Sequence, residues 1–103
     1  MMRLTKKEWE KVETSKKPAI IDFSAEWCMP CRALAPIFDE LSTEIKEANF
    51  FKVDIDTEEE LSNEFQIMSV PTILIIKNNV EIGRINGFSN KEHLKSALLS
   101  KIK

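Results

Sequence analysis

The chain has 103 residues, of which 43% are hydrophobic and 31% charged, as in an ordinary globular domain with enough apolar material to close a core. Its 15 Lys and Arg and 17 Asp and Glu give a formal charge of -2, with both signs scattered along the chain. This balance argues against a nucleic-acid binder. We therefore expect residues 1–103 to form one domain, with no nucleic acid among its partners.

The sequence contains no stretch that is apolar enough to cross a membrane. The longest apolar run near the centre, residues 70–76, falls far short of the roughly twenty residues that a spanning helix needs. Residues 1–8 become charged at once and lack the apolar segment of a secretory signal. We therefore expect a cytoplasmic protein, although a processed export product would have the same pattern. In the cytoplasm, a cysteine pair is more often catalytic or metal-binding than structural.

The chain begins with signals for a short helix and then a buried strand. Thr5 and Glu8 have the spacing of a capping box, which predicts a helix over residues 6–14. Residues 19–24 are apolar and partly β-branched, which is typical of a strand covered on both faces. Asp22 is the exception in that run, because a carboxylate is costly to bury in its charged form.

A long amphipathic helix and a second strand follow. Apolar residues recur three or four positions apart from Cys28 to Ala48 and predict the helix. Residues 49–55 are strand-like, and Thr57 and Glu60 have the spacing of a second capping box at the start of another short helix.

The last third of the chain predicts a hairpin. Residues 72–76 and 80–85 have the pattern of two antiparallel strands joined through Asn78 and Asn79, which tolerate the positive φ of a tight turn. The parity of the apolar residues slips near Gly83, which indicates a β-bulge.

A third capping box, at Ser89 to Glu92, predicts a final helix that packs on the sheet. The elements in order form an early strand-helix-strand unit, a hairpin and a covering helix. Because the crossover of such a unit is right-handed, its helix covers one face of the sheet. The fold class is therefore α/β, with a mixed central sheet and helices on both faces.

Cys28 and Cys31 lie where the first strand leads into the long helix. Residues three apart on the first turn of a helix have Cα atoms about 5–5.5 Å apart, which a disulfide accepts without large strain. The helix dipole and the unpaired amides stabilise a thiolate at Cys28, which predicts that Cys28 is the attacking nucleophile. Cys31, one turn deeper and more sheltered, is expected to resolve the mixed disulfide.

Two other interpretations of the cysteine pair remain open. A Cys-x-x-Cys pair is also one arm of many zinc sites, but the chain has no third cysteine and its single histidine is His93. We therefore expect no metal. Two inert buried cysteines are the other alternative, which placement at a helix start disfavours.

Asp22 and Lys52 are candidates for supporting the cysteines. With a raised pKa, the Asp22 carboxylate could take the proton of Cys31, directly or through a water. The alternative is a carboxylate that reaches solvent at the end of its strand. Lys52 lies on the neighbouring predicted strand, where it either pairs with Asp22 or faces solvent. Pro71 begins a further strand, and the pattern alone leaves its peptide isomer open.

Residues 21–32, with Trp27-Cys28-Met29-Pro30-Cys31 at their centre, resemble the active-site segment of the thioredoxin family. The match covers nearly the entire chain. It continues, in the family's order and spacing, through Lys52-Val53-Asp54, Val70-Pro71-Thr72, Lys77-Asn78 and Gly87. This resemblance implies a thioredoxin-like fold. Its sheet should have four to five strands, because residues 1–4 leave room for only a short first edge strand.

The resemblance also implies roles for the site residues. Cys28 would attack substrate disulfides, Cys31 would resolve, and Asp22 would accept the proton with Lys52 as its neighbour. Pro71 would be cis and lie against the cysteines, and the backbone of Val70 would pair with an extended substrate segment. The apolar docking surface would consist of Trp27, Met29, Pro30 and Gly87. Met29 departs from the family's pattern, which has glycine at this position.

The chain is therefore expected to be a protein-disulfide reductase and electron carrier that needs no bound cofactor. A separate thioredoxin reductase, either a flavoprotein or a ferredoxin-linked enzyme, would re-reduce it, and the expected oligomeric state is a monomer. The alternative is a non-catalytic binding module that uses the apolar rim around the cysteines.

Overall fold

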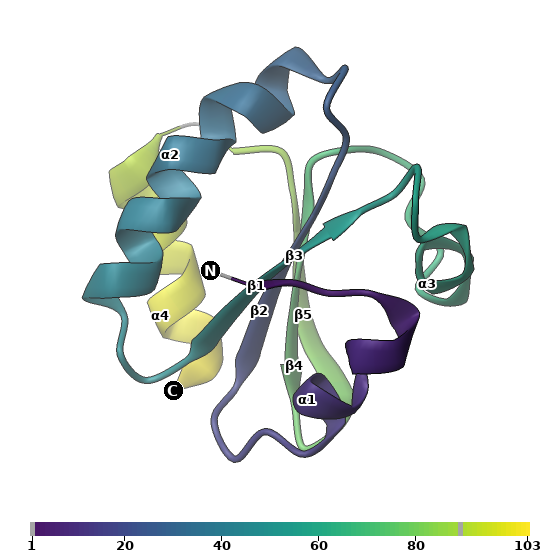
Figure 1. Cartoon of the computed structure of the whole chain (residues 1–103). Helices are drawn as coiled ribbons and strands as arrows, with labels where there is room; N and C mark the ends of the chain where they lie inside the picture. Colours follow the sequence, from purple (N-terminus) through teal and green to yellow (C-terminus); the bar gives the residue numbers. More distant parts are fainter. Residues whose placement is uncertain (1, 89) are drawn as a thin grey trace.

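The computed structural model describes residues 2–88 and 90–103, which form a five-stranded mixed sheet in the order β1-β3-β2-β4-β5. The strands are β1 (Met2–Arg3), β2 (Ala19–Ser24), β3 (Asn49–Asp54), β4 (Thr72–Lys77) and β5 (Val80–Asn86). The helices are α1 (Glu10–Glu13), α2 (Met29–Glu44), α3 (Glu59–Glu64) and α4 (Lys91–Ile102), and the 3-10 turn η1 (Lys6–Glu8) precedes α1. Figure 1 shows α2 and α4 on one face of the sheet and α1 and α3 on the other. The predicted α/β fold is confirmed.

The direction of the strands places the cysteine turn beside the start of β4. β3 runs parallel to β1 and β2, whereas β4 runs antiparallel to β2 and to β5. Phe23, near the end of β2, therefore lies opposite Thr72, the first residue of β4. The segment that leads into β4 and the turn that leads into α2 thus meet at the same end of the sheet, where β2 ends and β4 begins.

Two apolar cores cover the two faces of the sheet. Successive side chains of a strand point to opposite faces, so Ile20 packs with the α2 and α4 side while Ile21 and Phe23 pack with the α1 and α3 side. This double coverage explains why β2 is apolar almost throughout. Asp22 has the parity of Ile20 and is therefore directed toward the α2 side of the sheet.

The predicted helices begin and end differently in two places. The helix expected over residues 6–14 is divided into η1 and α1, and the Glu8 carboxylate accepts a hydrogen bond from the Thr5 amide at 3.2 Å. Helix α2 ends at Glu44, short of the predicted Ala48, because Ile45 adopts an extended backbone with φ -95° and ψ 93°. Ile45 and Ala48 are both buried, so the chain turns there toward β3.

The other two predicted caps have different outcomes. The prediction that a capping box at Thr57 starts the next helix is wrong, because Glu58 is the N-cap of α3. The Glu58 carboxylate instead accepts a hydrogen bond from the Lys6 amide at 2.9 Å. Ser89 lies outside the described residues. Asn90 is the N-cap of α4, and its side-chain oxygen accepts from the His93 amide at 2.9 Å.

The hairpin between β4 and β5 and its β-bulge are confirmed. Asn78 and Asn79 have φ values of 52° and 63°, which asparagine tolerates better than most residues. Ile75 lies opposite Gly83 and Ile76 opposite Glu81, so Ile82 is the extra residue of the bulge. The bulge lies on the free edge of the sheet, where the Ile82 side chain is exposed.

Candidate active site

Cys28 is the N-cap of α2, and Pro30 lies within the first turn. The Cys31 amide donates a hydrogen bond to the Cys28 sulfur at 3.2 Å, and the same sulfur lies 3.7 Å from the Val70 carbonyl oxygen. Both cysteines are free thiols. The first turn of the helix therefore directs an amide and the positive end of its dipole at this sulfur.

The two cysteines differ in electrostatics more than in exposure. Cys28 and Cys31 are both buried, at 5% and 4% exposed, so residue burial hardly distinguishes them. Desolvation, together with the hydrogen bond to Cys28, raises the pKa of the Cys31 thiol to about 12. Cys31 therefore holds its proton at neutral pH until a nearby base removes it.

Asp22 is buried, with 1% of its surface exposed, and its Oδ1 has no hydrogen-bond partner among the described residues. Burial raises the pKa of this carboxyl from 3.8 to about 7, while the positive charge of Lys52 opposes that rise and the negative charge of Asp39 adds to it. The predicted raised pKa is thus supported. The alternative of a solvent-exposed carboxylate is wrong.

Lys52 lies directly opposite Asp22 in the β2–β3 ladder. Its ammonium nitrogen nevertheless forms an ion pair with Asp39 on α2, at 3.7 Å from Oδ1. Among the described residues, Asp22 belongs to no ion pair. Lys52 is thus the neighbour of Asp22 that the resemblance implies, but the ion pair between them, one of the two alternatives, is not formed. Asp39 was not predicted, because its position beside Lys52 depends on how α2 packs on β3.

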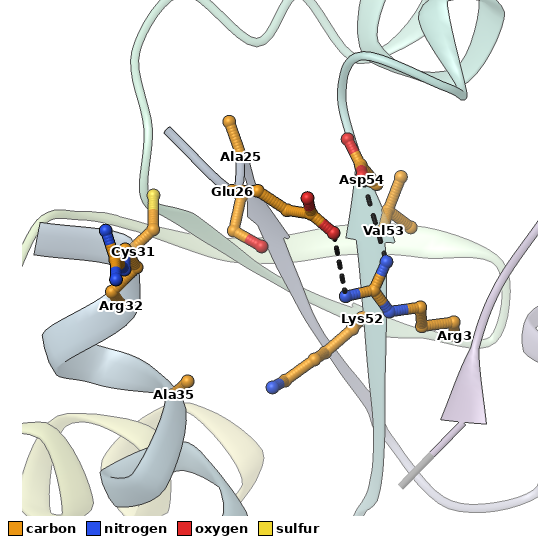
Figure 2. A pocket seen from close by; sticks show the side chains of 10 residues that line it. Arg3, Ala25, Glu26, Cys31, Arg32, Ala35, Lys52, Val53 and Asp54 are labelled. Atoms are coloured by element: carbon orange, nitrogen blue, oxygen red, sulfur yellow. Dashed lines mark ion pairs between the residues drawn. The ribbon is translucent and has the colours of Figure 1, made fainter. Parts of the chain in front are cut away.

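A small cavity of about 120 Å³ connects Cys31 with Lys52 (Figure 2). Arg3 closes one side of the cavity, where its guanidinium lies 3.7 Å from Asp54 and 4.0 Å from Glu26. A cavity of this size with charged side chains on its wall has room for water. The remaining wall consists of Ser24, Ala25, Arg32, Ala35 and Val53.

A larger groove, of about 420 Å³, lies beside the Cys28 sulfur. The Trp27 indole is 67% exposed at its wall and donates a hydrogen bond to Asp56 at 2.8 Å. Met68 also borders the groove and is 91% exposed. Exposed apolar side chains around a nucleophile can bind the apolar parts of a substrate. The full wall is Trp27, Cys28, Pro30, Ile55, Ile67, Met68, Ser69 and Val70.

The predicted docking residues are only partly gathered at this groove. Met29 and Gly87 do not line it, although Met29 is 73% exposed one residue from Cys28. The Gly87 amide donates to the Pro71 carbonyl at 2.9 Å, next to the Val70–Pro71 peptide, which is cis as expected. Sequence reasoning missed Ile67 and Met68, which lie in a loop where no periodic pattern marks them, and Ile55, which was predicted as the last residue of a strand that in fact ends at Asp54.

The described residues contain neither a cluster of metal ligands nor a membrane-spanning helix. Among residues 2–88 and 90–103, no three His, Cys, Asp or Glu side chains gather as metal ligands. His93, the single histidine, lies on α4. Within the described chain, no helix has the length and apolarity that crossing a bilayer requires.

The site combines two free thiols at the first turn of α2, a buried carboxyl on β2 and a cis-proline just before β4. This combination defines a protein that exchanges dithiol for disulfide. The thioredoxin family model matches residues 1–100, and the chain belongs to this family. It is a thioredoxin-type protein dithiol-disulfide oxidoreductase.

Individual relatives agree with this assignment. A thioredoxin of Mycoplasmoides gallisepticum is 36% identical over 99 residues, which are 95% of this chain and 99% of the relative. The X-ray structure of Fasciola hepatica thioredoxin superimposes with a TM-score of 0.88 at 35% identity, covering 98% of this chain and 99% of that one. A bifunctional thioredoxin reductase/thioredoxin of Mycobacterium leprae is 37% identical over 84 residues, which are 81% of this chain and 18% of the relative.

Proposed function

We propose that this chain reduces disulfides in other proteins, with Cys28 as the nucleophile and Cys31 as the resolving thiol. The observation that carries the assignment is the hydrogen bond from the Cys31 amide to the Cys28 sulfur at 3.2 Å. This bond and the helix dipole stabilise negative charge at Cys28. At Cys31, desolvation and the hydrogen bond to Cys28 outweigh a backbone hydrogen bond at Ala25, and the pKa of this thiol is raised to about 12.

The reaction proceeds in two exchanges. The Cys28 thiolate attacks one sulfur of the substrate disulfide, so that a mixed disulfide forms and the first substrate sulfur leaves as a thiolate. Cys31 then loses its proton and attacks the Cys28 sulfur. This second step releases the other substrate thiolate and leaves a Cys28–Cys31 disulfide. Two electrons have passed from the protein to the substrate.

Asp22 is the proposed base for the second exchange. Because burial raises the pKa of its carboxyl to about 7, Asp22 can both accept and return a proton near neutral pH. The cavity lined by Cys31 and Lys52 has room for a water beside the Cys31 thiol, although Asp22 itself is not among its lining residues. Lys52 stabilises the charged form of Asp22 from the neighbouring strand.

The groove beside Cys28 is the proposed binding surface for the substrate chain. Trp27 and Pro30 offer apolar contacts, and the edge of Val70 before the cis bond offers backbone groups to an extended segment. Met29 and Gly87 extend this surface outside the groove itself. The Val70 carbonyl already lies near the Cys28 sulfur, so a strand paired there would present its disulfide to the nucleophile.

We further propose a thioredoxin reductase as electron donor, either a flavoprotein or a ferredoxin-linked enzyme. The fused reductase and thioredoxin of Mycobacterium leprae supports this class of partner. We propose a single working domain that acts as a monomer, since helices cover both faces of its sheet. A cytoplasmic location agrees with a carrier that must be kept reduced.

A disulfide reduction assay with the purified chain tests the assignment. With dithiothreitol as electron source, the chain should accelerate reduction of insulin, and its potential against glutathione should be about -270 mV. Cys28→Ser should abolish turnover, whereas Cys31→Ser should accumulate a mixed disulfide that mass spectrometry detects. No turnover by the unaltered chain, or an adduct trapped on Cys31 in Cys28→Ser and none on Cys28 in Cys31→Ser, would contradict the proposed roles.

A further inference from the structure

Lys52 lies between two carboxyl groups of different character. In the β2–β3 ladder it is directly opposite Asp22, so both side chains leave the same face of the sheet toward α2. Asp39 approaches from α2, with Oδ1 at 3.7 Å from the Lys52 ammonium nitrogen. The ammonium thus pairs with the carboxylate on the helix and leaves its cross-strand neighbour without an ion pair.

The two carboxyl groups differ in their contact with water. The Asp39 side chain is 58% exposed and carries its charge in a hydrated environment. Asp22 is buried, and its Oδ1 lacks a hydrogen-bond donor among the described residues. A charge is costly to bury at Asp22 but not at the hydrated Asp39. The ion pair of Lys52 with Asp39 agrees with this difference.

Lys52 also lies at the boundary of two cavities. The inner cavity, of about 120 Å³, reaches Cys31 and is shown in Figure 2, where the Lys52 side chain extends toward α2. The outer cavity, of about 410 Å³, is lined by Asp39, Ser42 and Thr43. Arg3 and Lys52 belong to both walls. The ammonium can therefore be held toward the outer cavity or move toward the inner one.

We propose that Asp39 is a positioning residue of the redox site, which holds the Lys52 ammonium toward the outer cavity and away from the Asp22 carboxyl. This inference rests on the proposed role of Asp22 as the base for Cys31. With Lys52 held outward, Asp22 keeps enough basicity to take the proton of the Cys31 thiol. The proton moves from sulfur to a carboxylate oxygen, and no electrons are exchanged in this step.

The electrostatics around Asp22 agree with this arrangement. Lys52 lowers the pKa of Asp22, and Asp39 raises it. Arg3, the cation shared by both cavities, is already bound to Asp54 and Glu26. The further titratable or charged groups from α2 are Cys31, whose pKa the negative charge of Asp22 raises, and Arg32, in the wall of the inner cavity.

Titration of the Asp22 carboxyl carbon by NMR, in the full-length reduced chain, tests the proposal. Asp39→Asn should release Lys52 toward Asp22 and lower the proton affinity of Asp22 about threefold to tenfold. Asp39→Glu should keep the ammonium outward and restore the original midpoint. A merely structural role of Asp39 would alter thermal unfolding without moving this titration.

Glu40→Gln is the matched control. Glu40 follows Asp39 on α2 and pairs with Lys91 at 2.7 Å, so this variant removes the same charge from a different ion pair. The Asp22 midpoint should stay unchanged in it. An unchanged or raised midpoint in Asp39→Asn, or an equal drop in Glu40→Gln, would overturn the proposal.

A double-mutant cycle with Lys52→Met tests whether Asp39 acts through Lys52. In that background, Asp39→Asn should lose more than half of its effect on the Asp22 midpoint. An undiminished effect would mean that Asp39 acts on Asp22 without the lysine and would refute the inference. Insulin reduction by the unaltered chain is measured in parallel. Failure there would instead contradict the proposed function, which separates the two outcomes.

Discussion

Met68 shows how a single side chain can affect recognition without taking part in the chemistry. It lies in the segment between α3 and β4, on the wall of the groove beside Cys28. At 91% exposure it is the most exposed of the large apolar side chains reported for the described residues. An apolar side chain left this open next to a nucleophile gains free energy when a partner covers it.

We expect Met68→Ser to raise the KM for a protein disulfide about threefold while kcat stays within twofold, because apolar contact is lost in the encounter and the thiols are untouched. Steady-state insulin reduction measures both constants. Val80→Ser is the control, since Val80 is an exposed apolar residue at the hairpin end of β5, far from the cysteine turn. Equal KM changes in both variants would contradict a specific role for Met68.

At the scale of elements, sequence patterns predict strands and turns that depend on neighbouring residues. They fail to predict helix ends that depend on contacts with distant segments. The buried strand 19–24 and the Asn78–Asn79 turn follow from residue type alone. The end of α2 does not, because residues after Ile45 would continue a helix, yet Asn49 must donate its amide to the Pro18 carbonyl at 2.9 Å for β3 to pair.

The sequence likewise predicts the site residues that lie close together along the chain, but not the contacts between distant segments. The positions of Cys28 and Asp22 follow from one strand-to-helix segment and can be read along the chain. The Lys52–Asp39 ion pair joins a strand and a helix that meet only in the folded protein. Exposed groove residues such as Met68 carry no periodic signal, so apolarity there looks like ordinary loop composition.

The β4–β5 hairpin provides a test of turn energetics. Asn79 has φ 63°, a region that glycine enters at lower cost than asparagine and alanine enters at higher cost. Asn79→Gly should therefore raise the free energy of unfolding by about 0.5 kcal/mol, and Asn79→Ala should lower it by about 1 kcal/mol. Urea denaturation at constant pH measures both values. Equal stability of the alanine variant and the unaltered chain would contradict a strained turn.

At the scale of the whole molecule, the buried Asp22 carboxyl couples function to stability. Its pKa is about 7 in the folded chain against 3.8 for an ordinary carboxyl, so the folded state binds the proton more tightly than the unfolded state. Stability contributed by this group is therefore complete at low pH and is lost as the pH rises from about 4 to about 7. The loss is on the order of 4 kcal/mol.

Asp22→Asn should remove this dependence, because an amide does not titrate. We expect the variant to be more stable than the unaltered chain at pH 8, by about 2 to 4 kcal/mol, and nearly equal to it at about pH 4. Chemical denaturation across this pH range measures the difference. Glu59→Gln, at an exposed position, is the control and should follow the unaltered chain. Parallel curves for Asp22→Asn and the unaltered chain would disprove the linkage.

The bulge in β5 has a consequence for behaviour at high concentration. A regular outer strand offers an unbroken row of amides and carbonyls onto which a neighbouring molecule can add its own strand. Ile82 interrupts that row, and the charged pair Glu81 and Arg84, 2.9 Å apart, flanks the interruption. A bulge and charged side chains on an outer strand disfavour edge-to-edge pairing, even though Val80 and Ile82 on this strand are exposed.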